Sequence, residues 1–94
     1  MATPHVPRTY TILTRAAPRR QLTQLQKTHN PNAKHIIAAI RSLAENPRPP
    51  GSQKLSSRPE RRVRVGDYRI IYLVDDARHT VTISAIAHRR EVYR

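Results

Sequence analysis

Several residue types are absent or scarce in this chain, and each absence removes a class of site. The 94 residues include no cysteine, phenylalanine or tryptophan and only two glycines. Without cysteine there is neither a disulfide framework nor a thiolate zinc site, and two glycines cannot build a glycine-rich phosphate loop. The five histidines lack the spacing of metal ligands, so we expect no metal and no organic cofactor. They are His5, His29, His35, His79 and His88.

Long hydrophobic runs are missing as well. No segment approaches the roughly 18 continuous apolar residues that a membrane span requires. The first nine residues hold two prolines and no apolar stretch of the kind that a secretory signal carries. We therefore expect a cytoplasmic protein with no membrane partner. A chain of this length builds one core, so we expect residues 1–94 to form a single domain, with residues 1–8 as a flexible lead.

Acidic residues are also scarce, and the charge that results is the most informative feature of the composition. Six Asp and Glu stand against 18 Lys and Arg, which gives a formal net charge of +12. So basic a surface attracts polyanions, and arginine forks match phosphate oxygens in a bidentate geometry. A need for solubility or a general basic bias of the composition would also explain a net charge of +12, so charge alone does not decide whether the protein binds nucleic acid. The aliphatic core is thin, which favours stabilisation by a bound partner.

The N-terminal part of the chain predicts a strand followed by a helix. Tyr10 and Ile12 alternate with threonines over residues 9–14, which is typical of a strand. Thr14 is expected to cap a helix over residues 15–28, whose first turn tolerates a proline.

A second, stronger helical pattern follows over residues 32–45. Asn30 is expected to cap this helix ahead of a first-turn proline, and Asn46 to end it. Apolar residues recur there at three- and four-residue intervals, which is one face of a helix. This face comprises Ala33, Ile36, Ile37, Ile40, Leu43 and Ala44.

The C-terminal half changes to a period of two, which is typical of strands. After a proline-rich connector at residues 47–52, a turn at residues 66–67 separates a strand around residues 62–65 from a central strand over residues 68–74. A last strand follows over residues 81–86. The pattern predicts an α+β domain in the order β-α-α-β-β-β, with two N-terminal helices packed on one face of an antiparallel sheet of about four strands. In the last strand, Val81, Ile83 and Ala85 are expected to alternate with Thr82, Ser84 and Ile86.

This alternation predicts a cluster of arginines. If Val63 and Val65 face the helices, Arg62 and Arg64 face the opposite, uncovered side, and Arg69 lies close to them across the turn. Guanidinium groups repel one another at such separations, and the fold gains nothing from this cluster unless an anion sits between them. The alternative is a solvated basic edge that discourages aggregation.

The C-terminal segment adds further candidates. Arg89, Arg90 and Tyr93 come within reach of the same surface if the last strand pairs with the central one. Neighbouring arginines favour a phenolate, so Tyr93 is a candidate general base, although a tyrosine near a terminus is more often a packing residue. Histidine titrates near neutrality, which makes His88 a second candidate for proton transfer, against the alternative of a surface histidine at a strand end.

Three segments, LAENPRPPGSQKL, RRVRVGDYRIIYLVDD and ISAIAHRREVYR, occur in this order. The chain resembles the RelE toxins of the RelE/ParE superfamily of toxin and antitoxin pairs, and the resemblance covers residues 10–94. It implies the fold class given above, a ribosome-dependent and metal-independent endoribonuclease activity, and a co-expressed antitoxin.

The resemblance also implies a site made of basic side chains and one tyrosine. The best-known members carry lysines where Arg62 and Arg64 stand, a departure that preserves charge but removes an easily tuned proton. The implied reaction is attack of an mRNA 2'-hydroxyl on the adjacent phosphate, with Tyr93 as the base, the arginines stabilising phosphoryl charge, and His88 or water protonating the leaving group. The matching catalytic positions are Arg62, Arg64, Arg69, Arg89 and Tyr93, and the residues expected to bind RNA are Lys54, Arg61, His88 and Arg90.

The implied partners are the ribosome, mRNA and a cognate antitoxin whose acidic segment covers Arg62, Arg64 or the C-terminal tail beside them. Two alternatives stay open. The ParE branch shares the fold but binds DNA gyrase, and a non-catalytic module would use the basic face only for RNA or for the antitoxin. The arginine positions and Tyr93 favour the branch that cleaves RNA.

Overall fold

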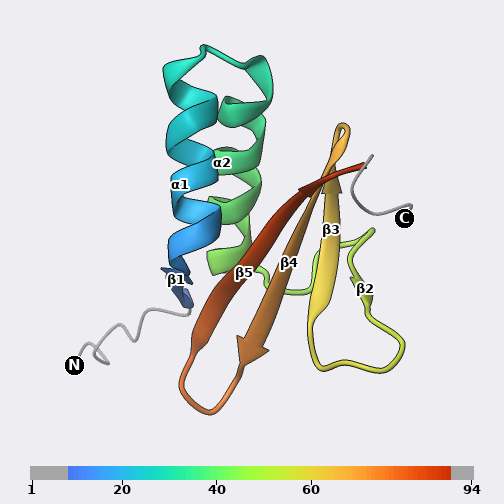
Figure 1. The fold of residues 1–94 in the computed structure, drawn as a ribbon. Helices are drawn as coiled ribbons and strands as arrows, with labels where there is room; N and C mark the ends of the chain where they lie inside the picture. Colours follow the sequence, from blue (N-terminus) through green and yellow to red (C-terminus); the bar gives the residue numbers. More distant parts are fainter. Residues whose placement is uncertain (1–8, 90–94) are drawn as a thin grey trace, which may run out of the picture.

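Two helices pack against one face of a five-stranded sheet in the computed structural model, which describes residues 9–89 (Figure 1). The α+β class predicted from the sequence is confirmed, and both helices begin and end within one residue of expectation. The expected flexible lead, residues 1–8, lies outside the described residues. In chain order the elements are β1 (Thr11–Thr14), α1 (Ala16–Lys27), α2 (Pro31–Glu45), β2 (Gln53–Lys54), β3 (Arg61–Val65), β4 (Tyr68–Asp75) and β5 (Thr80–His88).

The caps of the two helices differ. Asn30 caps α2 as predicted, because its side-chain oxygen accepts a hydrogen bond of 2.9 Å from the backbone N–H of Asn32. The prediction that Thr14 caps α1 is wrong. Arg15 holds that position without a side-chain cap bond, because Thr14 is still paired in β1 with Ile83 of β5. Thr14 therefore belongs to the sheet and does not cap the helix.

The sheet is mixed rather than antiparallel throughout. Its strand order is β1-β5-β4-β3-β2, and β1 runs parallel to β5 whereas all other pairs are antiparallel. A parallel pair needs a long crossover, which the two helices and the following strands provide. The strand that the sequence did not predict is β2. It has only two residues, which are too few to form an alternation pattern in the sequence.

The core lies between α2 and the central strands. Ile36 and Leu43 of α2 are fully buried against Ile70 of β4 and Ile83 of β5. Val63 packs at the margin of the same cluster, as the alternation in β3 predicts. One face of β3, β4 and β5 is thus committed to the helices, and the other face is left for solvent or a partner.

A β-bulge interrupts the alternation in β5. The register between β4 and β5 shifts at Ser84, so the buried positions change from Val81 and Ile83 to Ile86. The predicted grouping of Ala85 with Val81 and Ile83 is therefore wrong beyond Ile83, because the extra residue turns the rest of the strand over. Alternation patterns carry no signal for such an insertion.

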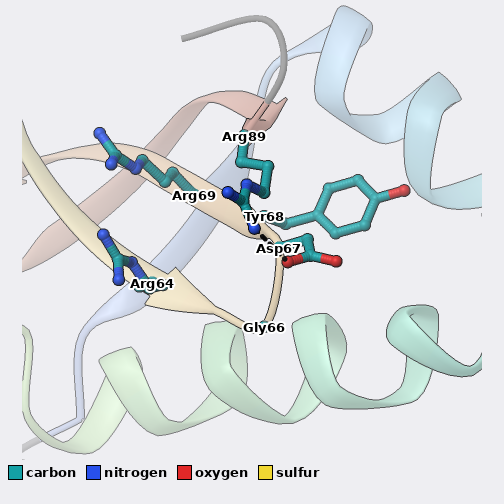
Figure 2. A pocket seen from close by; sticks show the side chains of 6 residues that line it. All are labelled: Arg64, Gly66, Asp67, Tyr68, Arg69 and Arg89. Carbon is teal, nitrogen blue, oxygen red and sulfur yellow. Dashed lines mark ion pairs between the residues drawn. The ribbon is translucent and has the colours of Figure 1, made fainter. Parts of the chain in front are cut away.

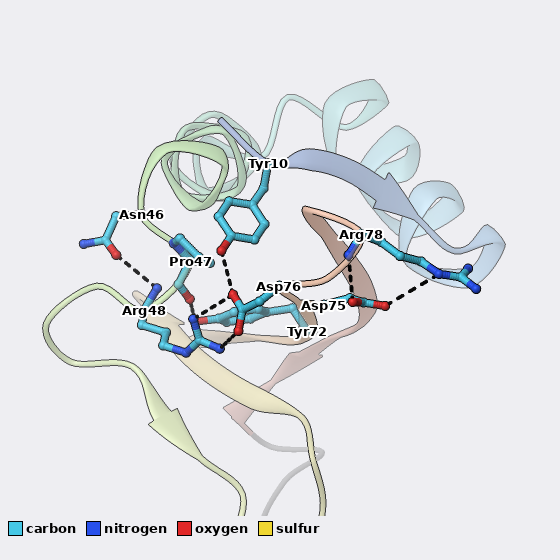
Figure 3. Close-up of polar contacts among 8 residues, drawn as sticks. All are labelled: Tyr10, Asn46, Pro47, Arg48, Tyr72, Asp75, Asp76 and Arg78. Atoms are coloured by element: carbon cyan, nitrogen blue, oxygen red, sulfur yellow. Dashed lines mark hydrogen bonds and ion pairs between the residues drawn. The ribbon is translucent and has the colours of Figure 1, made fainter. Parts of the chain in front are cut away.

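A polar clamp joins three segments at the end of the sheet where β1 begins (Figure 3). Asp76, in the turn between β4 and β5, accepts a hydrogen bond of 2.6 Å from the Tyr10 hydroxyl. Arg48, in the connector after α2, donates to both carboxylate oxygens of Asp76 at 3.2 and 2.9 Å. Beside it the buried hydroxyl of Tyr72 donates to the carbonyl oxygen of Pro47 at 2.7 Å. These bonds hold the proline-rich connector against the sheet.

Neither helix in the part of the chain that the structure describes is long and apolar enough to cross a membrane.

We expect Asp76→Asn to lower the thermal unfolding midpoint at neutral pH and to flatten its acid dependence. Hydrogen bonds donated by Arg48, and then by Tyr10, hold the pKa of Asp76 at about 2 instead of its usual 3.8. Because the folded-state pKa is depressed, the stabilisation is fully present above about pH 4 and is lost as the pH falls toward 2. Thermal melts of both proteins across this range measure the difference.

The matched control is Glu45→Gln, which removes an exposed carboxylate at the end of α2. It should melt with the acid dependence of the parent. Parallel acid profiles for the parent and Asp76→Asn would contradict the assignment.

Candidate functional site: an arginine pocket on the uncovered face of the sheet

A pocket of about 160 Å³ lies at the tip of the β3–β4 hairpin, where the end of β5 comes alongside (Figure 2). We call it the arginine pocket. Three guanidinium groups come to it from three different places, the end of β3, the start of β4 and the residue after β5. The lining residues are Arg64, Gly66, Asp67, Tyr68, Arg69 and Arg89.

Strand register explains why the arginines meet. Tyr68 and Ile70 are buried toward the helices, so Arg69 between them faces the other side of the sheet. Arg64 is directly opposite Arg69 across β3 and β4, and Ala87 is opposite Arg69 on β5. The small Ala87 side chain leaves space beside Arg69.

This register places the positively charged Arg64 and Arg69 directly opposite each other. Like charges directly opposite each other on neighbouring strands are destabilising. Arg69 is also only 9% exposed, so water screens it less than it screens Arg64, which is exposed. An anion bound between the two guanidinium groups removes the repulsion, and a phosphate presents oxygens in the geometry that arginine forks match.

The turn between β3 and β4 forms one wall of the arginine pocket. Gly66 has a φ of 58°, the left-handed region that favours glycine, and a Cβ there would lie 3.3 Å from Oδ1 of Asn32. Its neighbour Asp67 accepts a backbone hydrogen bond of 2.7 Å from the N–H of Arg89 and lies 3.8 Å from the Arg89 guanidinium. The turn therefore positions Arg89 beside the other two arginines.

A second hollow of about 310 Å³ continues from the arginine pocket along the same face. It shares Arg64 and Arg69 with the pocket, and Arg62 adds a third guanidinium group. The Arg62 side chain donates a hydrogen bond of 2.7 Å to Oε1 of Gln53. Because β2 pairs with β3 at this point, the short edge strand sets the direction of Arg62. The residues lining this hollow are Gly51, Gln53, Arg62, Arg64 and Arg69.

Three of the residues expected to bind RNA lie on the opposite face of the sheet. Lys54 pairs with Arg61, and Arg61 pairs with the buried Tyr72, so the register assigns both to the side of the helices. His88 is opposite Tyr68 and meets its ring edge-on at a centroid distance of 5.0 Å. The structure therefore does not bring Lys54, Arg61 or His88 into the arginine pocket.

Two of the expected site residues, Arg90 and Tyr93, lie outside the described residues. Arg62, Arg64 and Arg69 come together on the uncovered face as the alternation predicted, and Arg89 joins them because the last strand pairs with the central one. Their roles in binding or catalysis stay predictions.

Sequence reasoning took Gly66 and Asp67 only as a turn and missed them as part of the site. The signal was present, because Asp67 is the single acidic residue in the basic stretch RRVRVGDYR. Ala87 was missed for a different reason, since only the bulge at Ser84 assigns it to the uncovered face.

Comparison with known proteins decides the family. The model of a protein family described as "ParE toxin of type II toxin-antitoxin system, parDE" matches residues 12–93. The chain belongs to this toxin family. Its place in the RelE/ParE superfamily agrees with the resemblance drawn from the sequence. Among proteins with curated functions, no sequence matches this toxin.

Solved toxin structures share the fold. A chain of the RelBE2 toxin–antitoxin complex from Mycobacterium tuberculosis is 25% identical with a TM-score of 0.70, over 86% of this chain and 92% of that one. A chain of the archaeal RelE–RelB complex from Pyrococcus horikoshii is 24% identical with a TM-score of 0.73, over 86% and 96%. The YoeB dimer from Staphylococcus aureus is 20% identical with a TM-score of 0.70, over 85% and 97%. The likeness supports the two-layer architecture of this toxin.

We expect Gly66→Ala to lower the free energy of unfolding by about 1–2 kcal/mol, because an alanine at this positive φ is strained and its Cβ crowds Asn32. Urea unfolding measures the loss. Gly51→Ala is the comparison, since Gly51 also has a positive φ but has no atom within 4 Å of the added Cβ, so its loss of stability measures backbone strain without crowding. A Gly66→Ala protein that unfolds at the parental urea concentration would count against this role for the turn.

Proposed function

We propose that this toxin is an endoribonuclease that cleaves mRNA on the ribosome. The observation that carries the proposal is the arginine pocket, in which register puts Arg64 directly opposite Arg69 and the β3–β4 turn adds Arg89. A site that gathers positive charge at a cost to stability suits a reaction in which negative charge builds up on phosphoryl oxygens. The resemblance of the sequence to RelE toxins supports the same reaction.

The chemistry proposed is an internal transesterification. The 2'-oxygen of the RNA attacks the adjacent phosphorus, a new P–O2' bond forms, and the P–O5' bond breaks. The products are a 2',3'-cyclic phosphate and a 5'-hydroxyl, with no water consumed in this step. Arg64, Arg69 and Arg89 would hold the non-bridging oxygens, because guanidinium groups stay charged at neutral pH and are poor proton donors. Arg62 would bind a neighbouring phosphate from the second hollow.

Proton transfer is assigned to residues near the C-terminus. Tyr93 is proposed to accept the 2'-hydroxyl proton, since it follows Arg89 and Arg90 closely in the sequence and nearby positive charge favours a phenolate. His88 is a weak candidate for the leaving-group acid, because its register position is on the face opposite the arginine pocket. Water is the simpler donor to the departing 5'-oxygen.

An antitoxin is the proposed silencing partner. Related toxin structures were determined in complex with RelB or with YefM. A net charge of +12 suits a partner that contributes an acidic segment.

Inhibition of DNA gyrase is the second candidate function, and the family description, ParE toxin, is the observation that favours it. Such a toxin needs a binding surface but no reactive phosphate in the arginine pocket. The two functions therefore differ in one expected result. Loss of a single arginine from the pocket should reduce RNA cleavage only if the toxin is a nuclease.

We expect brief induction of the toxin without its antitoxin to produce new mRNA 5' ends within translated codons, each bearing a 5'-hydroxyl. Arg64→Ala and Arg89→Ala should each lower ribosome-dependent cleavage by about 10²-fold or more, because each removes a preorganised charge at the phosphate. Lysine at either position should recover part of the rate. Sequencing of 5' ends, followed by single-turnover cleavage on purified ribosomes, measures both effects.

Arg41→Ala is the matched control, since it removes the same charge from the exposed side of α2. It should change only the salt dependence of binding. Replication arrest and gyrase inhibition with intact mRNA would reject the nuclease and support the second candidate. A harmless protein would reject both.

We expect Tyr93→Phe to lower single-turnover cleavage by about 10²- to 10⁴-fold while folding and ribosome binding are retained, because phenylalanine keeps the ring and removes the proton acceptor. His88→Ala, measured beside it, should cleave within a few-fold of the parent. Parental cleavage by Tyr93→Phe together with an inactive His88→Ala would move the base to His88.

A further inference from the structure

Of the residues that line the second hollow, Gln53 alone has a side chain that is polar and uncharged. It lies in β2 directly opposite Arg62 of β3, and its Oε1 accepts a hydrogen bond of 2.7 Å from the Arg62 guanidinium. Gln53 therefore belongs to the same surface as the arginines but adds no charge to it.

Hydrogen bonds on both sides of β2 hold Gln53 in place, although this strand has only two residues. Before the strand, the Arg61 side chain donates a hydrogen bond of 3.0 Å to the Ser52 hydroxyl. After the strand, the backbone N–H of Leu55 donates to the carbonyl oxygen of Glu60 at 2.9 Å. The Gln53 side chain is thus placed beside Arg62 before any ligand binds.

The bond to Arg62 also fixes which way the Gln53 amide is turned. A guanidinium group only donates hydrogen bonds, so the amide oxygen must face Arg62. The amide nitrogen, with its two N–H donors, then faces away from Arg62. Gln53 is exposed, so these donors are accessible to a ligand in the second hollow.

The partner of Arg62 differs from the partners of arginines elsewhere in residues 9–89. Three of those arginines form ion pairs with carboxylates, namely Arg48 with Asp76, Arg58 with Glu60 and Arg78 with Asp75. A carboxylate neutralises the guanidinium that it holds, whereas an amide orients the group and leaves its charge available to an anion. The pairing with Gln53 therefore suits an arginine that binds a phosphate.

We propose that Gln53 is a positioning residue for the RNA phosphate next to the scissile one. Its Oε1 orients Arg62 toward this phosphate, and its amide nitrogen donates a hydrogen bond to the same group. The inference rests on the proposed function, which assigns the scissile phosphate to the arginine pocket. Arg62 and Arg64 are two residues apart on one face of β3, about 7 Å, which successive phosphates of an extended strand can span.

The role of Gln53 predicts an effect on binding and not on the chemical step. The neighbouring phosphate keeps its charge during the reaction, so contacts to it stabilise the bound RNA and the transition state equally. An arginine already oriented by Gln53 also loses less side-chain freedom when the phosphate binds.

The first test is single-turnover cleavage on ribosomes that carry mRNA, measured over a range of toxin concentrations. We expect Gln53→Met to raise the half-saturating concentration about tenfold and to leave the maximal rate within about threefold of the parent. Gln53→Glu keeps an acceptor for Arg62 but loses the N–H donors and adds negative charge, so it should raise this concentration at least as far. In an Arg62→Ala background, Gln53→Met should have a smaller effect, because the residue that it orients is gone.

The matched controls are Gln24→Met and Gln24→Glu, which make the same changes at an exposed position of α1 and should cleave like the parent. Parental half-saturation of both Gln53 variants overturns the proposal. A lower maximal rate with unchanged half-saturation also overturns it, since Gln53 would then act in the chemical step. An equal effect of Gln53→Met with and without Arg62 rejects the positioning role.

A second test measures the phosphate contact without cleavage. The probe is an RNA hexanucleotide with every 2'-oxygen methylated, titrated into full-length toxin that is released from its antitoxin and refolded. The side-chain amide NMR signal of Gln53 should shift, and Gln53→Met should raise Kd about tenfold. A parent that shows this shift but cleaves no mRNA rejects the nuclease and supports the role of Gln53. A Gln53 signal that does not move as the probe binds overturns the proposal, whether or not the parent cleaves.

Discussion

The register of β3, β4 and β5 is the constraint on which both faces of this protein depend. Side chains alternate along each strand, so burial of Tyr68, Ile70 and Tyr72 against the helices requires Arg69 to face the other way. A slip of one residue would bury arginine under the helices and expose the core, and the loss of burial forbids it. The hydrophobic core therefore holds the arginine pocket in place from the opposite side of the sheet.

The arginine pocket itself works against stability. Arg64 and Arg69 are opposite each other, Arg69 is nearly buried, and Arg89 is brought to them by a turn that itself needs a glycine at positive φ. Water screens Arg69 less than it screens the exposed Arg64 and Arg89, and an anionic ligand would offset the repulsion between Arg69 and Arg64. The polar clamp around Asp76 lies at the end of the sheet where β1 begins and joins Tyr10, the connector after α2 and the turn between β4 and β5.

The bulge at Ser84 gives the uncovered face its composition. It turns over the last part of β5, so Ile86 enters the core and the small Ala85 and Ala87 lie on the uncovered side. Those two alanines separate the exposed Leu13 and Leu73 from Arg89 and leave room beside Arg69. The result is a face that changes from apolar residues to arginines along β4.

The sequence by itself determined the elements whose signals are local. Apolar spacing predicted α2, Asn30 predicted its cap, and the alternation of Val63 and Val65 with arginines predicted the basic face, because each signal is set by chain geometry within a few residues. Only the tertiary structure decided the parallel pairing of β1, the two-residue β2, the loss of Thr14 to the sheet, and the register that separates His88 and Lys54 from the arginine pocket. These depend on which strands become neighbours and on one inserted residue at Ser84, and both are settled by packing between segments far apart in the chain.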